Sequence, residues 1–231
     1  MWLYRSSGYN KHGVRINTPI VLYDYQPDRK AKRPAEFLHG YKGYLHTDGY
    51  EAYHSLPKDI VVVGCWAHAR RKFDEALKKL STDDRSYTNV AEGKRYCDKL
   101  FKLEWDFTEL PPDERFQKRI WFSKPLIDEF FVWLNELGTI PKTPIGVAAG
   151  YVLKQRKYLE RFLLDGRLEI SNNRAERSIK PFVIGRKNFL FANTPRGAKA
   201  SAVIFSIIET VIECGIDPFS YLTYIFTNAP N

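Results

Sequence analysis

The chain has 231 residues, of which 44% are hydrophobic and 15% aromatic, enough for a sizeable core and too many for wholesale disorder. No stretch approaches the roughly 20 uncharged apolar residues that cross a bilayer, and no apolar leader follows Met1, so neither a membrane span nor secretion is expected. Three widely spaced cysteines, Cys65, Cys97 and Cys214, argue against a disulfide framework and favour a reducing, cytoplasmic compartment.

The charge is unevenly distributed. Lys and Arg total 36 against 27 Asp and Glu, a net charge of +9. Residues 165–199 hold eight basic and three acidic side chains, and Arg70, Arg71 and Lys72 form a second basic run. One such run is usually a solvated surface, but two beside motif-like sequence favour a nucleic-acid partner.

The first part of the chain predicts strands and short helices. Residues 2–5, 20–25 and 43–47 are rich in β-branched and aromatic side chains, with Gly, Pro and Asn between them. Residues 60–63 are wholly apolar and β-branched, which is typical of a strand buried on both faces. Short helices or turns are expected at 34–38 and 49–56. The alternation predicts a mixed α/β sheet.

The pattern becomes helical after Cys65. Residues 67–80 have a helical apolar period, and residues 87–164 predict several helices that are interrupted near Pro111 and at 138–144. An apolar helix is expected over 198–214, and Gly215 with Pro218 beyond it predicts where this helix ends.

Asp48 comes at the end of the predicted strand 43–47, directly before Gly49. A carboxylate at the carboxyl end of a central strand is held rigidly and is a common metal or catalytic ligand. The alternative is that Asp-Gly is only a turn signal.

A predicted helix begins near Asn173. Asn173, Glu176, Arg177 and Lys180 have i, i+3, i+4 and i+7 spacing and therefore share one helix face, which could hold a metal and a phosphate. The alternative is a capping box between Asn173 and Glu176. Cys65 and His68 have Cys-x-x-His spacing, but a closed zinc site is not expected because no second such pair occurs.

In combination, these segments resemble the catalytic domain of the insertion-sequence-66 family of bacterial DDE transposases. The resemblance rests on four stretches in register. They are residues 41–50, residues 65–73, the long match from 171–177 through 185–191, and Gly197-Ala198 with the apolar helix that contains Glu209. It implies an α/β, ribonuclease-H-like mixed sheet with a helical insertion and C-terminal helices. Residues 1–80 would be the first part of the catalytic core, 81–164 the insertion, and 165–231 the rest of the core with the third carboxylate.

The resemblance also implies the chemistry. Enzymes of this class cleave phosphodiesters at transposon ends and transfer the strand to target DNA, using three carboxylates that hold two Mg²⁺ or Mn²⁺ ions. By position, Asp48 is the second carboxylate and Glu176 the third. The residues expected to contact double-stranded DNA are Arg70, Arg71, Asn173, Arg177, Lys180, Arg186 and Lys187. His68 would lie near the site without an assigned role. A homodimer on paired ends and association with the bacterial nucleoid would follow.

The pattern departs from the family at its start. The first carboxylate, on an Asp-Glu-Thr strand, has no counterpart, and residues 2–5 match the strand after it, so the first strand of the sheet is expected to be missing. Asp24 is the available substitute, although the resemblance places it on the third strand. Two functions therefore stay open: a transposase catalytic core, which would be inactive alone unless another acid replaces the missing first carboxylate, or a non-catalytic DNA-binding remnant.

Overall fold

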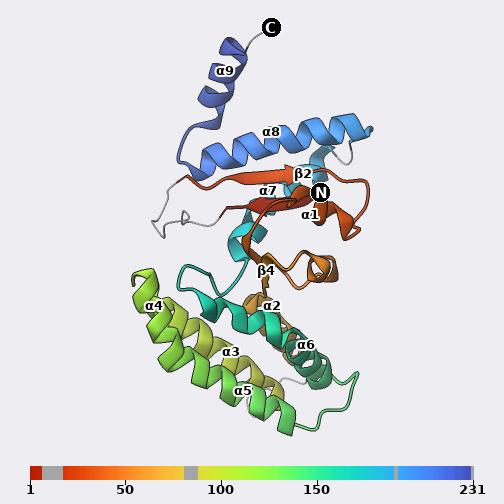
Figure 1. The fold of residues 1–231 in the computed structure, drawn as a ribbon. Helices are drawn as coiled ribbons and strands as arrows, with labels where there is room; N and C mark the ends of the chain where they lie inside the picture. The colour runs from red at the N-terminus through yellow and green to blue at the C-terminus, as the bar shows by residue number, and fades with distance from the viewer. Residues whose placement is uncertain (7–17, 81–87, 190–191, 230–231) are drawn as a thin grey trace. The chain divides into compact units, whose positions relative to one another are not determined.

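The computed structural model describes residues 1–6, 18–80, 88–189 and 192–229, and its fold is α/β and mostly helical (Figure 1). The chain divides into two compact units. The terminal unit comprises Met1–Arg33 and Asn173–Asn231, and the central unit comprises Pro34–Asn172. The sequence analysis divides the chain into a core and an insertion, with boundaries at 80/81 and 164/165. These boundaries differ from those of the two compact units and stay a prediction. Within the described ranges, no helix is long and apolar enough to cross a bilayer.

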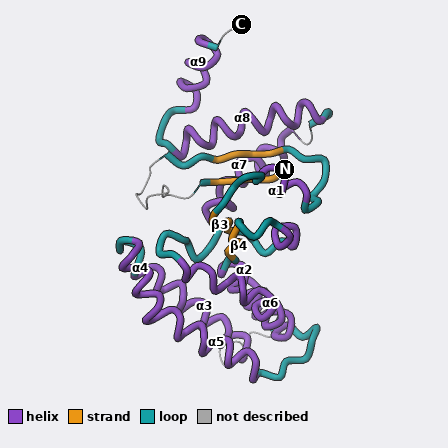
Figure 2. The backbone as a smooth tube through the Cα atoms, in the orientation of Figure 1, coloured by secondary structure: helices purple, strands orange, loops and turns teal. Residues whose placement is uncertain are grey.

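The α/β prediction is confirmed, but the described residues form two small sheets rather than one mixed sheet (Figure 2). In the terminal unit, β1 (Trp2–Arg5) pairs antiparallel with β2 (Val21–Asp24). In the central unit, β3 (Gly43–His46) pairs in parallel with β4 (Ile60–Val63). All four predicted strands are present, with shifts of at most one residue at their ends.

Helix α8 (Pro195–Glu213) packs against β2 through small and hydroxyl side chains. Ala202, Ser206 and Thr210 follow one another at four-residue spacing and share a face of the helix. The Ser206 hydroxyl accepts a hydrogen bond from the Tyr23 amide at 2.8 Å, and Thr210 Oγ1 accepts from the Val21 amide at 3.0 Å. These side chains satisfy backbone groups that a further strand would otherwise pair, so α8 covers this edge of β2.

The end of α8 was predicted correctly. Gly215 adopts φ +73°, its amide donates to the carbonyl of Ile212 at 2.9 Å, and the Ile216 amide donates to the carbonyl of Val211 at 3.0 Å. This pair of bonds is a Schellman motif, which glycine allows because it tolerates the left-handed conformation. Beyond it lies α9 (Pro218–Asn228), and Asp217 is its N-cap residue. The Asp217 carboxylate accepts a hydrogen bond from the Ser220 amide at 2.7 Å.

The central unit is built from helices around β4. Their aromatic core includes Trp66, Phe73, Phe130, Phe131 and Phe162, all buried. Figures 1 and 2 show α3, α5 and α6 side by side below the small sheet. The helical segments of this unit, which the sequence predicted only approximately, are α2 (Trp66–Leu77), α3 (Asn89–Asp106), α4 (Pro112–Lys118), η3 (Arg119–Ser123), α5 (Lys124–Glu136), α6 (Pro144–Leu159) and η4 (Glu160–Leu164). The short helices α1 (Lys32–Phe37) and η1 (Glu51–Ser55) precede them, and α1 spans the boundary between the units.

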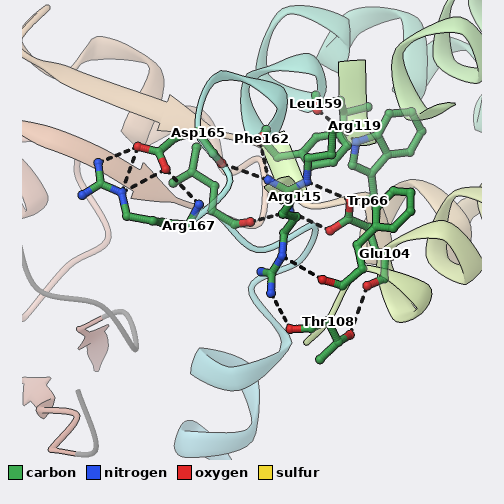
Figure 3. A network of polar contacts seen from close by, with 11 residues as sticks. Trp66, Glu104, Thr108, Arg115, Arg119, Leu159, Phe162, Asp165 and Arg167 are labelled. Carbon is green, nitrogen blue, oxygen red and sulfur yellow. Dashed lines mark hydrogen bonds and ion pairs between the residues drawn. The ribbon is translucent and has the colours of Figure 1, made fainter. Parts of the chain in front are cut away.

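Arg119 lies at the centre of a buried polar network in this unit (Figure 3). Its guanidinium donates to both carboxylate oxygens of Glu104, at 2.8 and 2.6 Å. It also donates to the carbonyls of Phe162 and Asp165, both at 2.9 Å, and of Leu168 at 2.7 Å. One side chain therefore joins α3 to the chain segment that follows α6.

Arg119 is the first residue of a π-helix. The segment η3 (Arg119–Ser123) continues α4 and leads into α5. Arg115, Arg119 and Ser123 are all buried. Residues four apart lie on the same face of a helix, so the three side chains point to the same side of the α4–η3 segment.

The Arg119 network should dominate the stability of the central unit. We expect Arg119→Met to lower the free energy of unfolding by about 3–5 kcal/mol, because it leaves the Glu104 charge and three main-chain carbonyls without their donor. Urea denaturation followed by circular dichroism measures this. Lys102→Met, which breaks an exposed pair with Asp106 of 2.5 Å, is the control and should change stability by less than about 1 kcal/mol. Equal losses in the two variants would contradict the assignment.

Candidate functional site

Asp48 lies at the carboxyl end of β3, as the sequence predicted. The preceding residue, Thr47, is buried, and its amide donates to the carbonyl of Val63 at 2.9 Å, so the parallel pairing extends to the residue before Asp48. The Asp48 side chain is exposed, and its Oδ1 accepts a hydrogen bond from the Tyr50 amide at 3.0 Å. The Asp-Gly pair is therefore both a turn and a strand-end carboxylate directed to solvent.

Gly49 allows this turn. Its φ is +85°, and a Cβ built on it would lie 3.0 Å from the hydroxyl of Tyr151 on α6. A side chain at this position would be both strained and in close contact with α6. The turn that carries Asp48 is thus shaped by a helix about 100 residues further along the chain.

Two histidines lie near this turn. His46 Nε2 is 2.7 Å from the carbonyl of Gly64, and burial lowers the pKa of His46 to about 4, so the neutral ring donates this bond. His68, in the first turn of α2, lies nearby, and its charge also lowers the pKa of His46. Cys65, immediately before α2, is buried. His68 thus lies near His46, the last residue of β3.

Glu176 lies in the first turn of α7 (Asn173–Phe189), in the terminal unit. Asn173 is the first residue of this helix, so Asn173, Glu176, Arg177 and Lys180 do share one face. Glu176 is partly exposed, and Arg177 and Lys180 are exposed. The helix face predicted from the spacing is present.

The start of α7 is held by β1 and β2. Arg5 donates to the Ser178 hydroxyl at 2.7 Å and binds both carboxylate oxygens of Glu213 on α8, at 2.5 and 2.7 Å. The Tyr23 hydroxyl donates to the carbonyl of the same Ser178. Both bonds end two residues after Glu176, so they fix the turn of helix that carries it.

Glu209 on α8 is a buried acid to which the sequence analysis assigned no role. Burial, and then the charge of Glu213, raises the pKa of Glu209. Burial, and then the charge of Glu209, likewise raises the pKa of Tyr23. Glu209 is the one charged residue in the run 200–212, and this is the sequence signal that could have singled it out.

The three candidate carboxylates are distributed between the two units. Asp48 belongs to the central unit, whereas Glu176 and Asp24 belong to the terminal unit. Asp24 ends β2, where its carboxylate accepts from Gln26 Nε2 at 3.0 and 3.2 Å. Across the described ranges, no three His, Cys, Asp or Glu side chains are grouped to hold a metal ion. Carboxylate oxygens suit Mg²⁺, but the convergence of Asp48 with Glu176 stays a prediction.

The predicted DNA-contacting residues differ in their surroundings. Arg186 and Lys187, late in α7, are exposed, as is Arg71 on α2. Arg70 instead forms an ion pair of 2.5 Å with Asp98, which also binds Lys94 at 2.6 Å. Partial burial acts to raise the pKa of Asp98, but the bonds from Lys94 and Arg70 lower it. A phosphate would have to compete with Asp98 for Arg70, which the sequence did not reveal.

The Gly49 turn can be tested directly. We expect Gly49→Ala to lower the free energy of unfolding by about 1–2 kcal/mol, the cost of a left-handed alanine, with the Tyr151 contact adding to it. Gly150→Ala is the matched control, since Gly150 is an exposed helical residue of α6 with open space around it. That variant should gain up to about 1 kcal/mol. Thermal melts compare the two, and a destabilised Gly150→Ala beside a neutral Gly49→Ala would contradict the expectation.

The chain is similar to a family model and to several known proteins. Residues 1–200 match the family model described as Transposase IS66 family. Three proteins of Sinorhizobium fredii (strain NBRC 101917 / NGR234) are similar. The uncharacterized protein y4qI is 33% identical over 98% of this chain and 43% of its own length. The uncharacterized protein y4hP is 33% identical over 88% of this chain and 40% of its own length. The uncharacterized protein y4jD is 27% identical over 88% of this chain and 41% of its own length.

The chain thus spans about two fifths of the length of these relatives. No solved structure gives a significant match.

Proposed function

Because the chain belongs to the IS66 family of transposases, we propose that it forms part of a catalytic core that cleaves and transfers DNA strands at transposon ends. The observation that carries the proposal is Asp48. Its carboxylate is exposed at the end of a paired strand, in the position where the family resemblance expects a catalytic acid. The substrate would be double-stranded DNA, and two copies would act on paired ends.

Asp48 and Glu176 would be two of the carboxylates that hold divalent metal. Mg²⁺ or Mn²⁺ in such a site activates the attacking oxygen and stabilises the leaving oxygen of an in-line displacement. The donor chemistry fits, because both side chains offer hard oxygen ligands at least partly open to solvent. The protein would hold each carboxylate in a fixed position. For Asp48 it does so through the Tyr50 amide and the end of β3. For Glu176 it does so through the hydrogen bonds of Arg5 and Tyr23 to Ser178, in the same helix.

The proposal includes a ribonuclease-H-like sheet. Its support is the polarity of the strands, since one antiparallel pair precedes one parallel pair in the chain, as a mixed sheet of this type requires. In this arrangement, residues 81–164 are an insertion and residues 1–80 and 165–231 are the two parts of the core. Such a protein works where the DNA is, on the bacterial nucleoid.

The exposed basic residues of α7 would contact phosphates. We expect Arg186→Glu with Lys187→Glu to weaken duplex binding irrespective of sequence. The salt dependence of log Kd should also become shallower by about 2, because each lost phosphate contact removes about 0.9 from the slope. Fluorescence anisotropy between about 50 and 200 mM salt measures it. Lys99→Glu with Lys102→Glu on α3 makes the same change in net charge on exposed residues and serves as the control. Equal loss in both variants would mean that only net charge matters.

The carboxylate assignment predicts loss of cleavage without loss of binding. We expect Asp48→Asn and Glu176→Gln to abolish Mg²⁺-dependent nicking of a plasmid that carries the element's ends, and to leave DNA affinity unchanged. Asp59→Asn is the matched control, because Asp59 is an exposed carboxylate at the opposite end of the β3–β4 pair. Nicking retained in Asp48→Asn would refute the assignment.

The alternative function is a DNA-binding remnant without catalysis. The observation that favours it is the exposed basic run of α7, which would bind DNA without any metal ligand. Metal binding separates the two, because a core that lacks only its first carboxylate still binds Mn²⁺ through Asp48 and Glu176, whereas a remnant binds DNA with the salt dependence described above and neither binds Mn²⁺ at these residues nor nicks the plasmid.

A further inference from the structure

Four side chains of α6 lie on one face of the helix, toward the segment that carries Asp48. Tyr151, Lys154, Gln155 and Tyr158 have i, i+3, i+4 and i+7 spacing. The Tyr151 hydroxyl donates a long hydrogen bond, 3.4 Å, to the main-chain carbonyl of Asp48. This bond reaches the backbone of Asp48 and leaves its carboxylate open to solvent.

The other members of this face hold the residues on either side. Lys154 forms an ion pair of 2.9 Å with Glu51, three residues after Asp48. The Tyr158 ring stacks on His54 with 4.2 Å between the ring centroids. The carbonyl of Tyr158 accepts from the Gly64 amide at 2.9 Å, at the end of β4. The helix therefore follows the carboxyl end of the β3–β4 pair.

Gln155 fills the space beneath Gly49. It is 4% exposed, and its amide carbon would lie 3.4 Å from a Cβ at Gly49. With Tyr151 Oη at 3.0 Å from the same point, the glycine lies against two α6 side chains. A turn packed this closely has little freedom to rotate about its φ and ψ angles.

The Tyr151 hydroxyl keeps its proton at the pH of any ordinary assay. Burial, and then the charges of Cys65 and Asp48, raises the pKa of Tyr151 to about 12. Lys72 from α2 lies 5.7 Å from the centre of its ring. The tyrosine is thus held between α2 and the turn as a neutral donor.

We propose that Tyr151 is a positioning residue for Asp48: it acts from α6 on the backbone of the turn and fixes the direction in which the carboxylate faces. This inference rests on the proposed role of Asp48 as a metal ligand. It assigns a function to α6, the last α-helix of the predicted insertion. This helix would then take part in the site as well as separating two halves of the core. A ligand held within a narrow range of directions binds metal more tightly than one that rotates freely.

The test compares Tyr151→Phe with Tyr158→Phe. The first removes the hydroxyl that bonds to Asp48. The second removes a hydroxyl from the same helix face that makes no hydrogen bond within the described ranges. Two quantities are measured on the complete chain: hydrogen–deuterium exchange of residues 47–51, and the Kd for Mn²⁺ by electron paramagnetic resonance. Asp48→Asn is included to test the metal-ligand role itself.

We expect Tyr151→Phe to exchange faster at 47–51 and to raise the Mn²⁺ Kd about fivefold. This factor corresponds to a net hydrogen-bond contribution of about 1 kcal/mol. Tyr158→Phe should match the unaltered chain in both measurements, and Asp48→Asn should lose the Mn²⁺ binding. If Asp48→Asn loses binding but Tyr151→Phe behaves like Tyr158→Phe, the positioning role is wrong and the proposed function stands. If Asp48→Asn keeps its Mn²⁺ affinity, both are overturned.

Discussion

The buried ion pair between Arg119 and Glu104 is the contact on which the central unit depends. A guanidinium taken out of water is costly unless every donor finds an acceptor, and here the carboxylate and three carbonyls supply them. The carbonyls belong to the segment after α6, so the pair determines where α6 ends relative to α3. Arg115 holds the residues that directly follow α3, because it donates hydrogen bonds to the carbonyls of Phe107 and Thr108 at 3.2 and 2.6 Å.

This network connects the helices to the candidate site. Trp66 begins α2 and donates from its indole to the carbonyl of Leu159 at 2.9 Å, at the end of α6. The position of α6 is therefore defined by Trp66 on one side and by the Arg119 network just beyond it. Because α6 in turn contacts the Asp48 turn through Tyr151, a charge pair deep among the helices contributes to the orientation of an exposed carboxylate.

The strands and the last long helix were predictable because their signals are local. Residues 60–63 are four β-branched apolar residues in succession, and three of them are buried as expected; Val61 is partly exposed. Gly215 after an apolar period predicted the end of α8, since no other residue takes that conformation as readily. Asp48 was found for the same reason, as an acid followed by glycine at the end of a strand.

The π-helix and the polar networks were not predictable from such signals. Arg119 stands in a stretch of mixed charges that resembles a solvated helix face, and only the tertiary fold shows that its partners are carbonyls more than 40 residues away. The partner of Arg70 was not predictable either. The sequence analysis expected Arg70 to contact DNA, whereas in the structure it forms an ion pair with Asp98. The sequence around a charged residue does not show which residue will be its partner, because long-range pairing depends on where other segments pack.

Each of the two carboxylates is supported by contacts within its own unit. Asp48 depends on β4 and α6, and the helix of Glu176 depends on β1, β2 and α8 through Arg5 and Tyr23. Holding each ligand still and bringing the two together are therefore separate requirements of a bridging metal site. A variant that loosens one turn should weaken that ligand's contribution alone, whereas a failure to converge would abolish shared binding with both turns intact. This separation is why exchange at the Asp48 turn and metal affinity need to be measured on the same protein.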